Sequence, residues 1–144
     1  MNDLEVTSKR LKTKGLTLSI AKEHEIIFES KTHGISSLLY AIENAKERLE
    51  GASVADRVVG KAVALLCMYV KIKAIYAVTL SRPGKAVLEQ QGIYHKWAQL
   101  VESILDTRMT SQCPFEELAA EILDPTQAYL KLKTLQRSLS ARCP

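Results

Sequence analysis

The segment from Ala62 to Val70 carries no charged residue. A helix on a protein surface keeps one polar face, so a helix with this sequence must be covered nearly all round. We therefore interpret residues 53–70 as a central helix around which the other elements pack. Ser53 and Asp56 match a capping box, which would begin the helix at Ser53. The charged residues of the segment fall in its first two turns and are Asp56, Arg57 and Lys61.

Two cations at the start of this expected helix point to an anion. Arg57 and Lys61 are four residues apart, so they would share one helix face close to the positive end of the helix dipole. A ligand anion or a carboxylate from elsewhere in the chain would relieve the repulsion. The alternative readings are simple capping for Ser53 and Asp56, and a solvated or ion-paired face for the two cations.

Length and composition bound the class of protein. With 144 residues, 47% of them hydrophobic and 25% charged, we expect one globular domain. No apolar run approaches the roughly 20 residues of a membrane span, and residues 1–5 do not open a signal peptide. The three cysteines are odd in number and far apart, which argues against a disulfide framework. We therefore expect a cytoplasmic location and no membrane partner.

The charge pattern does not favour nucleic acid as a partner. The formal net charge is only +4, and neither basic group is interleaved with aromatic residues or set in a known motif. The first basic group is Lys9-Arg10-Lys12-Lys14, and the second consists of Lys131, Lys133, Arg137 and Arg142. The second group belongs to a basic helical tail that we expect from about residue 131.

The remaining patterns alternate between helix and strand. Strict alternation at 16–20, followed by the apolar residues 26–28, predicts a β-hairpin. The apolar, β-branched run 74–80 predicts a buried strand, and 93–95 an outer one. Helices are expected at 3–14, 36–49, 85–91 and 96–105, and two more begin at about 113 and 125. Gly15 and Gly92 would end the helices before them, and Ser36 or Ser37 would cap the helix at 36–49. Residues 106–112 are expected to form a polar loop. This order predicts an α/β fold, a three-layer α/β/α sandwich with a mixed central sheet.

Three stretches carry a resemblance to a known family: GASVADRVVGKAVALL, AIYAVTLSRPG and QCPFEE. They look like the bacterial and archaeal domain of unknown function 1893 family, whose fold is cytidine-deaminase-like. The resemblance covers roughly residues 3–130 and leaves the basic tail outside. It implies a helix, a hairpin and then helix-strand crossovers about a mixed sheet.

The resemblance does not imply deamination. Zinc deaminases need H-x-E or C-x-E at the start of the second core helix and P-C-x-x-C at the start of the next. We place these starts at 53–56 and 81–85, which read SVAD and SRPGK and contain no pair of metal ligands. The three histidines lack metal-ligand spacing, and they are His24, His33 and His95. We therefore expect no metal and no cofactor.

Two classes of function remain, with a third as an alternative to both. As a binding module, the protein would hold a small anionic or nucleotide-like ligand at helix N-termini through Ser53, Arg57, Lys61 and Ser81. As an enzyme, it would use Cys113, a thiol at a helix start, as nucleophile or redox group, with Asp56 as the second candidate catalytic residue. Cys113 has an alternative reading as a small, packed N-cap residue. The third reading is an inactive scaffold that forms a homo-oligomer.

Overall fold

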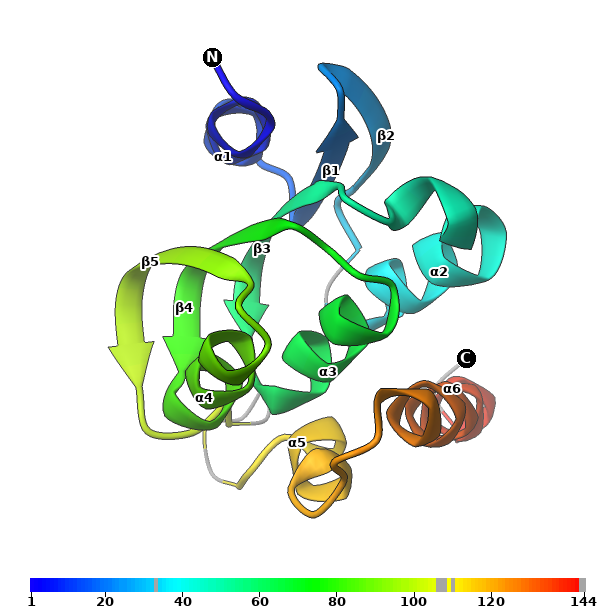
Figure 1. Ribbon diagram of the computed structural model, residues 1–144. Coiled ribbons are helices and arrows are strands. Elements are labelled where there is room, and N and C mark those ends of the chain that lie inside the picture. The colour runs from blue at the N-terminus through cyan, green and yellow to red at the C-terminus, as the bar shows by residue number, and fades with distance from the viewer. Residues whose placement is uncertain (33, 106–108, 110, 143–144) are drawn as a thin grey trace.

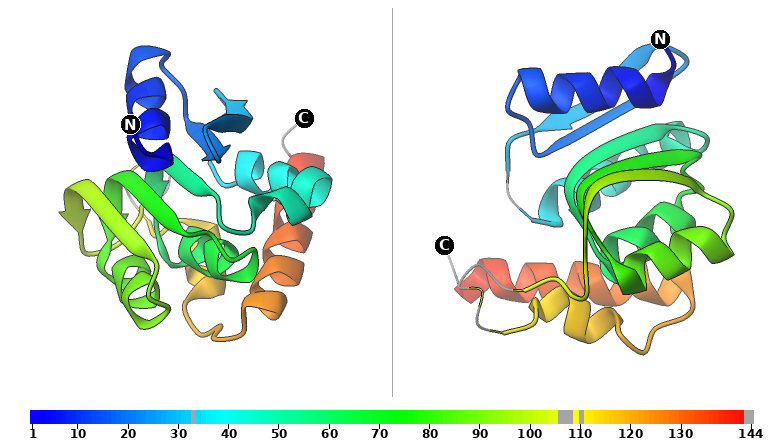
Figure 2. Two further views of the ribbon diagram at one scale, coloured as in Figure 1. Left: turned by 45° about the horizontal axis from the view of Figure 1, so that its top comes forward. Right: turned by 90° about the vertical axis from the view of Figure 1, so that its left-hand side faces the viewer.

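Five strands form one mixed sheet in the order β2-β1-β3-β4-β5. The structure is a computed structural model that describes residues 1–32, 34–105, 109 and 111–142. Helix α1 lies on one face of the sheet, α3 and α4 lie on the other, and α5 and α6 lie beyond α3 (Figures 1 and 2). The elements are α1 (Asp3–Thr13), β1 (Leu18–Lys22), β2 (Glu25–Ser30), α2 (Ser36–Leu49), β3 (Ser53–Val59), α3 (Lys61–Tyr69), β4 (Ala74–Ser81), α4 (Arg82–Gln90), β5 (Tyr94–Val101), α5 (Pro114–Ala119) and α6 (Pro125–Arg142).

Strand directions divide the sheet into two parts. Strand β1 runs antiparallel to both β2 and β3, whereas β3, β4 and β5 are parallel to one another. Parallel neighbours need a crossover, and here α3 and α4 provide the two crossovers on one face of the sheet. The expectation of an α/β fold with a mixed sheet is therefore confirmed.

The segment expected as one central helix is instead a strand followed by a helix. Gly60 separates β3 from α3 and is the N-cap residue of α3. Ser53 and Asp56 thus lie in a strand, and the capping box we expected is wrong. The apolar part of the interpretation is confirmed, because Ala62 to Cys67 are all buried in α3. The helix packs against β3, α4, α5 and α6, which explains why it lacks a polar face.

The helix expected at 96–105 is also wrong. Residues 94–101 form β5, so the outer strand expected at 93–95 is much longer than the sequence pattern indicated. Trp97, Leu100 and Val101 have helical spacing, but β5 is an edge strand whose residues are mostly exposed. Such a strand need not alternate between apolar and polar residues, so its pattern carries little information about the period.

The β1–β2 turn is made by two residues with positive φ, Glu23 at 50° and His24 at 67°. Residues other than Gly, Asn and Asp rarely have a positive φ, although both central residues of a two-residue hairpin turn of type I′ require one. The carboxylate of Asp3 in α1 accepts hydrogen bonds from both turn amides, at 2.9 Å from Glu23 N and 2.8 Å from His24 N. These bonds explain how a hairpin without glycine or asparagine at its turn keeps its shape.

Most other boundaries agree with the sequence patterns. Gly15 and Gly92 follow α1 and α4 with positive φ, and the expected strand at 74–80 is β4. Helix α4 begins at Arg82 rather than 85, and α2 has Ile35 as N-cap without a side-chain cap, so the serine cap predicted there is wrong. Part of the loop expected at 106–112 lies outside the described residues. No helix among the described residues is long and apolar enough to cross a membrane.

Candidate functional site

The N-terminus of α3 is occupied by a carboxylate of the chain itself. Glu116 of α5 is only 6% exposed. Its carboxylate accepts hydrogen bonds from Lys61 N at 2.7 Å and from Ala62 N at 2.8 Å. Burial raises the pKa of Glu116, while the two backbone N–H groups and the charge of Lys61 act against that rise. The anion expected at a helix start is therefore present as an internal side chain.

Two glycines allow this close packing. A Cβ on Gly60 would collide with the Glu116 carboxylate, so only glycine leaves room for it. A Cβ on Gly84, in the first turn of α4, would lie 2.8 Å from the backbone carbon of Gly60. The starts of α3 and α4 therefore touch through backbone atoms. The Glu116 carboxylate occupies the position that an anionic ligand would take at the start of α3.

Arg57 and Lys61 do not share a helix face, because Arg57 belongs to β3. The Arg57 guanidinium donates from Nε to Leu16 O at 2.7 Å and from Nη2 to Leu11 O at 3.2 Å. It thereby ties β3 to the carbonyls at and after the end of α1. Lys61 donates from Nζ to Ala120 O at 2.7 Å, which ties α3 to the end of α5. Both cations thus join elements of the fold.

The two serines of the expected binding site lie at opposite ends of the parallel strands. Ser53 begins β3 and lines a hollow of about 330 Å³ with Lys73 and Tyr94. Ser81 ends β4, is fully buried and accepts a hydrogen bond from Gly84 N at 3.1 Å as the N-cap of α4. The structure therefore does not bring Ser53, Ser81 and the two cations into one site.

Asp56 and Cys113 lie on different elements. Burial raises the pKa of Asp56 to about 7, against the lowering effect of backbone N–H groups of Val58 and Arg57. The charge of Asp56 acts on the thiol of Cys67 in α3. Burial is the larger cause of the raised pKa of Cys67, and the charge of Asp56 is the smaller one. Cys113 is the partly buried N-cap residue of α5, and its side chain makes no capping hydrogen bond.

The described histidines serve local contacts. His24 Nδ1 lies 3.7 Å from an Asp3 carboxylate oxygen. His95 Nδ1 lies 2.7 Å from Ile93 O, and its ring stacks on Trp97 at a centroid distance of 5.8 Å. His33 and Cys143 lie outside the described residues. Within the described part of the chain, no three His, Cys, Asp or Glu side chains gather as a metal site.

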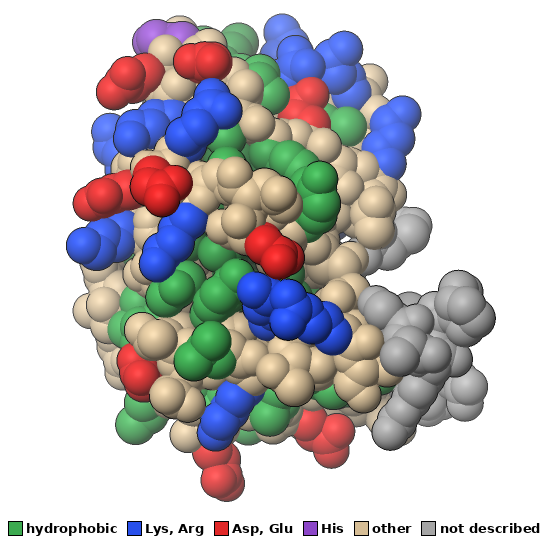
Figure 3. All heavy atoms as spheres, turned by 90° about the vertical axis from the view of Figure 1, so that its right-hand side faces the viewer, with side chains coloured by type: hydrophobic (Ala, Val, Ile, Leu, Met, Phe, Trp, Pro, Cys, Tyr) green, Lys and Arg blue, Asp and Glu red, His purple; other side chains and the backbone are tan. Residues whose placement is uncertain are grey.

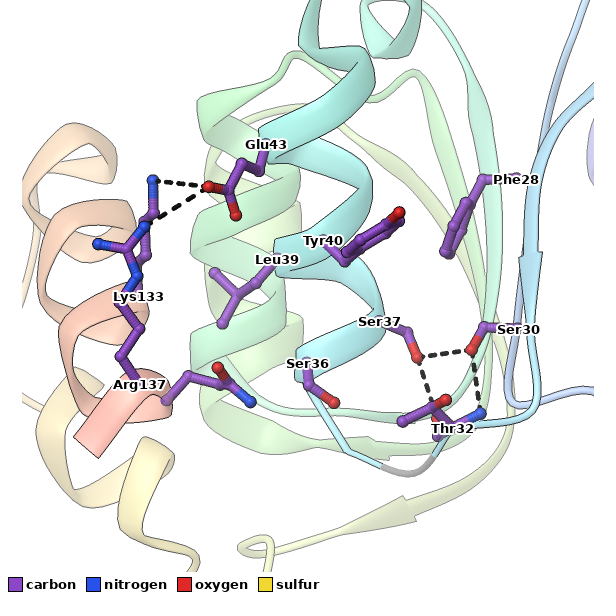
Figure 4. Close-up of a pocket in the computed structure, with 11 residues that line it drawn as sticks. Phe28, Ser30, Thr32, Ser36, Ser37, Leu39, Tyr40, Glu43, Lys133 and Arg137 are labelled. Atoms are coloured by element: carbon purple, nitrogen blue, oxygen red, sulfur yellow. Dashed lines mark hydrogen bonds and ion pairs between the residues drawn. The ribbon is translucent and has the colours of Figure 1, made fainter. Parts of the chain in front are cut away.

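A groove of about 420 Å³ lies elsewhere, between β2, α2 and α6. Figure 4 shows its lining, and Figure 3 shows the face that carries α2 and α6, where charged and apolar side chains are interspersed. We call it the β2–α2–α6 groove. Its lining residues are Phe28, Ser30, Thr32, Ser36, Ser37, Leu39, Tyr40, Glu43, Lys133, Gln136 and Arg137.

The cationic wall of the groove comes from α6. Lys133 Nζ and Arg137 Nη2 both approach Oε1 of Glu43 on α2, at 3.6 Å and 3.5 Å (Figure 4). The two positive charges therefore share one carboxylate in this group. Arg137 is well exposed, whereas Lys133 is three-quarters covered and lies 5.4 Å from the centroid of the Tyr129 ring.

The other side of the groove is polar at one end and aromatic at the other. The Ser30 and Ser37 hydroxyls are 2.9 Å apart, Ser37 Oγ donates to Thr32 O at 3.0 Å, and Thr32 N donates to Ser30 Oγ at 3.0 Å. The rings of Phe28 and Tyr40 meet at a centroid distance of 5.8 Å. The groove thus offers cations, hydroxyls and an aromatic surface from three elements.

Sequence reasoning missed this groove. Lys133 and Arg137 were noted only as part of a basic tail, and Glu43 and the hydroxyl residues drew no attention. The residues come from segments about a hundred positions apart, and no local motif joins them. The only available signal was the serine and threonine content of the loop before α2, which we interpreted as capping.

Comparisons with known proteins now add to this geometry. A family model described as a domain of unknown function, DUF1893, matches residues 6–135. The crystal structure of a DUF1893 family protein from Thermotoga maritima is similar, with 28% sequence identity and a TM-score of 0.84 over 92% of this chain and 89% of that chain. No curated protein matches the chain.

Proposed function

Because the chain belongs to the DUF1893 family, whose description assigns no activity, we propose a function from the groove itself: the protein binds a small anionic or nucleotide-like ligand between β2, α2 and α6. The ligand type is the one expected from the sequence, but the site is different. The start of α3 is taken by Glu116, and Arg57 and Lys61 donate to backbone carbonyls.

The observation that carries the proposal is the convergence of Lys133 and Arg137 on Glu43. Within this group, two cations face one carboxylate and leave an excess positive charge on the wall of the groove opposite the hydroxyls of Ser30 and Ser37. A guanidinium offers a planar fork of donors and an ammonium a compact charge, and both suit phosphate or carboxylate. The nearby Phe28 and Tyr40 rings give an apolar surface for the remainder of the ligand.

We also propose that the fold is cytidine-deaminase-like and works without zinc. The second helix is α2 and the next is α3, so the two deaminase motifs would fall at these starts rather than at 53–56 and 81–85. The α2 start reads Ile35-Ser36-Ser37 and the α3 start reads Gly60-Lys61-Ala62, without cysteine or glutamate. Without these residues the deaminase reaction has no zinc site at either helix start, and fold analogy alone supplies no other reaction. The cytoplasmic location stays a prediction.

The test is calorimetry and thermal shift with phosphate, sulfate and nucleoside monophosphates on the full chain. We expect phosphate-containing ligands to raise the melting temperature. Lys133→Ala and Arg137→Ala should each weaken binding about tenfold, because each removes a charge-assisted hydrogen bond. Lys131→Ala is the matched control, since Lys131 is exposed on the same helix and does not line the groove.

Two outcomes would contradict this function. One is a chain that binds none of these ligands, which would favour the scaffold reading. The other is equal loss in all three lysine and arginine variants, which indicates a general salt effect. No observation in the structure favours the reading of Cys113 as a nucleophile.

A further inference from the structure

Strand β5 forms one margin of the molecule and leaves one backbone edge without a partner strand in the described sheet (Figure 1). Tyr94 N donates to the O atom of Lys73, the residue before β4, and Tyr94 pairs with Ala74, so Tyr94 and every second residue after it direct their backbone groups toward β4. His95, Trp97, Gln99 and Val101 therefore direct theirs outward. An edge of eight residues with unpaired N–H and C=O groups is a template for another strand.

The two edges of the sheet differ in how they are protected. Strand β2, at the opposite edge, has Glu25 and Glu29 near its ends, and its pairing with β1 is interrupted by a register shift between Ile20 and Ala21. Charges and irregular pairing discourage strand addition. The edge strand β5 has one exposed charge, Lys96, but it contains no proline or glycine, and its pairing with β4 keeps one register throughout.

Two of the exposed side chains of β5 are aromatic. Tyr94 is 56% exposed and Trp97 is 38% exposed. Trp97 lies on the side of α4, because Lys85 Nζ is 5.3 Å from the centroid of its ring. An aromatic residue beside an unpaired edge gains buried area when a second strand is added.

We infer that β5 pairs antiparallel with β5 of a second copy of this chain, about a two-fold axis at Gln99. Antiparallel pairing requires outward-facing residues to lie opposite one another, which allows registers centred on either an outward or an inward residue of β5. The register centred on Gln99 places Trp97 opposite Val101 and Lys96 opposite Glu102 of the other copy. It forms about six backbone hydrogen bonds and joins the two sheets into one.

Charge complementarity selects this register and this partner. Centring the pair on Trp97, Ala98 or Leu100 places Lys96 opposite Ala98, Leu100 or Ile104, and centring it on Val101 places Lys96 opposite Asp106, which lies outside the described residues. Among the registers that pair described residues, the Gln99 register is the one that sets the cation of one copy against the carboxylate of the other, and it does so twice because of the two-fold symmetry. Glu102 is 82% exposed and also pairs with Arg82 of its own chain at 2.6 Å, so its carboxylate stays accessible.

Sedimentation velocity on the full chain over a concentration series tests the inference. Trp97 is the sole tryptophan, so its fluorescence emission reports on the same contact and should shift to shorter wavelength as the dimer forms. Gln99→Pro should give a monomer with unchanged circular dichroism, because the lost N–H points away from β4. Lys131→Ala, on α6, is the control that should leave the dimer intact.

A charge exchange makes the test independent of the proline variant. Lys96→Glu and Glu102→Lys alone should each raise the dimer dissociation constant about tenfold, because like charges then face each other twice. The two changes together should restore the wild-type value. A monomer at the highest concentration reached would overturn the inference. So would a dimer that survives both the single charge reversals and Gln99→Pro. The β2–α2–α6 groove lies at the other edge of the sheet, so neither result bears on ligand binding.

Discussion

Asp56 lies in the middle of β3, opposite Leu18 of β1 and Ala77 of β4. Its Oδ1 accepts a long hydrogen bond of 3.4 Å from Val58 N, and no cation is paired with it among the described residues. Burial therefore dominates and raises the pKa of its carboxyl to about 7. A carboxylate without a cationic partner in a sheet costs stability whenever it is ionised.

This position predicts an unusual pH dependence of stability. The pKa of Asp56 is about 7 in the folded chain and about 4 in the unfolded one, so between these pH values the folded chain holds the extra proton. The free energy of unfolding should then fall as the pH rises from about 4 to about 7, by at most about 1.4 kcal/mol per pH unit. Urea unfolding at several pH values measures this slope.

Asp56→Asn removes the titrating group and should flatten the slope while raising stability at pH 8 relative to the parent. The slope should not vanish, because burial also raises the pKa of Glu116. Glu121→Gln, at an exposed position after α5, is the control and should leave the slope unchanged. A slope that is the same in the parent and in Asp56→Asn would show that Asp56 is ionised in the folded chain without penalty.

At the scale of elements, α5 has only six residues and cannot be a stable helix alone. Glu116 joins it to α3 by two hydrogen bonds to backbone N–H groups. Glu116→Ala should lower the free energy of unfolding by about 2 kcal/mol, because it leaves these N–H groups without their acceptor. Denaturant unfolding measures the loss, and Glu117→Ala at the exposed neighbouring position should cost little.

A double-mutant cycle with Gly60 separates this contact from general damage. Gly60→Ala alone should also cost about 2 kcal/mol, because the added Cβ collides with the Glu116 carboxylate. In the Glu116→Ala background the same change should cost much less. Additive losses would mean that the two residues act independently and that the contact does not fix α5.

Several elements could be predicted from local patterns, and the failures have physical reasons. The alternation at 16–20 and the β-branched run at 74–80 gave correct strands. At 53–59, however, the segment SVADRVV does not alternate strictly between apolar and polar residues, and the spacing of Ser53 and Asp56 matches a helix capping box. The signals we passed over were Val58, Val59 and the break at Gly60. In β5, exposure on the sheet edge removed the alternation that identifies a strand.

The site was harder to predict than the elements. An anion was expected at a helix starting at Ser53, whereas the Glu116 carboxylate lies at the start of α3 after Gly60, so the part of the expectation that agrees with the structure is the alternative of a carboxylate from elsewhere in the chain. Glu116 itself is 55 residues from Lys61, and its place as the third residue of α5 suggested a local role. Long-range pairs of this kind depend on how the elements dock, which local sequence does not encode.

For the molecule as a whole, the absence of deaminase ligand motifs predicts that the purified protein contains no stoichiometric zinc. A zinc ion at the start of α3 would need thiolate ligands there. The residues present are Gly60, Lys61 and Ala62, and the carboxylate of Glu116 from α5 accepts hydrogen bonds from the backbone N–H groups of Lys61 and Ala62. Metal analysis of protein prepared without chelator measures the content. One zinc per chain, removed by chelator with a loss of stability, would contradict both the prediction and the zinc-independent function.

Helix α6 supplies the two cations of the groove, although it follows every strand of the sheet in the chain. During synthesis, the sheet and α3 leave the ribosome before residue 133 does, so the domain can begin to fold while the groove still lacks one wall. The proposed binding site is then complete only once α6 has docked. By linkage, a ligand that contacts both α2 and α6 would hold α6 in place and slow its removal by proteases. The rate of cleavage within α6 would thus report occupancy of the groove in a living cell, without any label on the ligand.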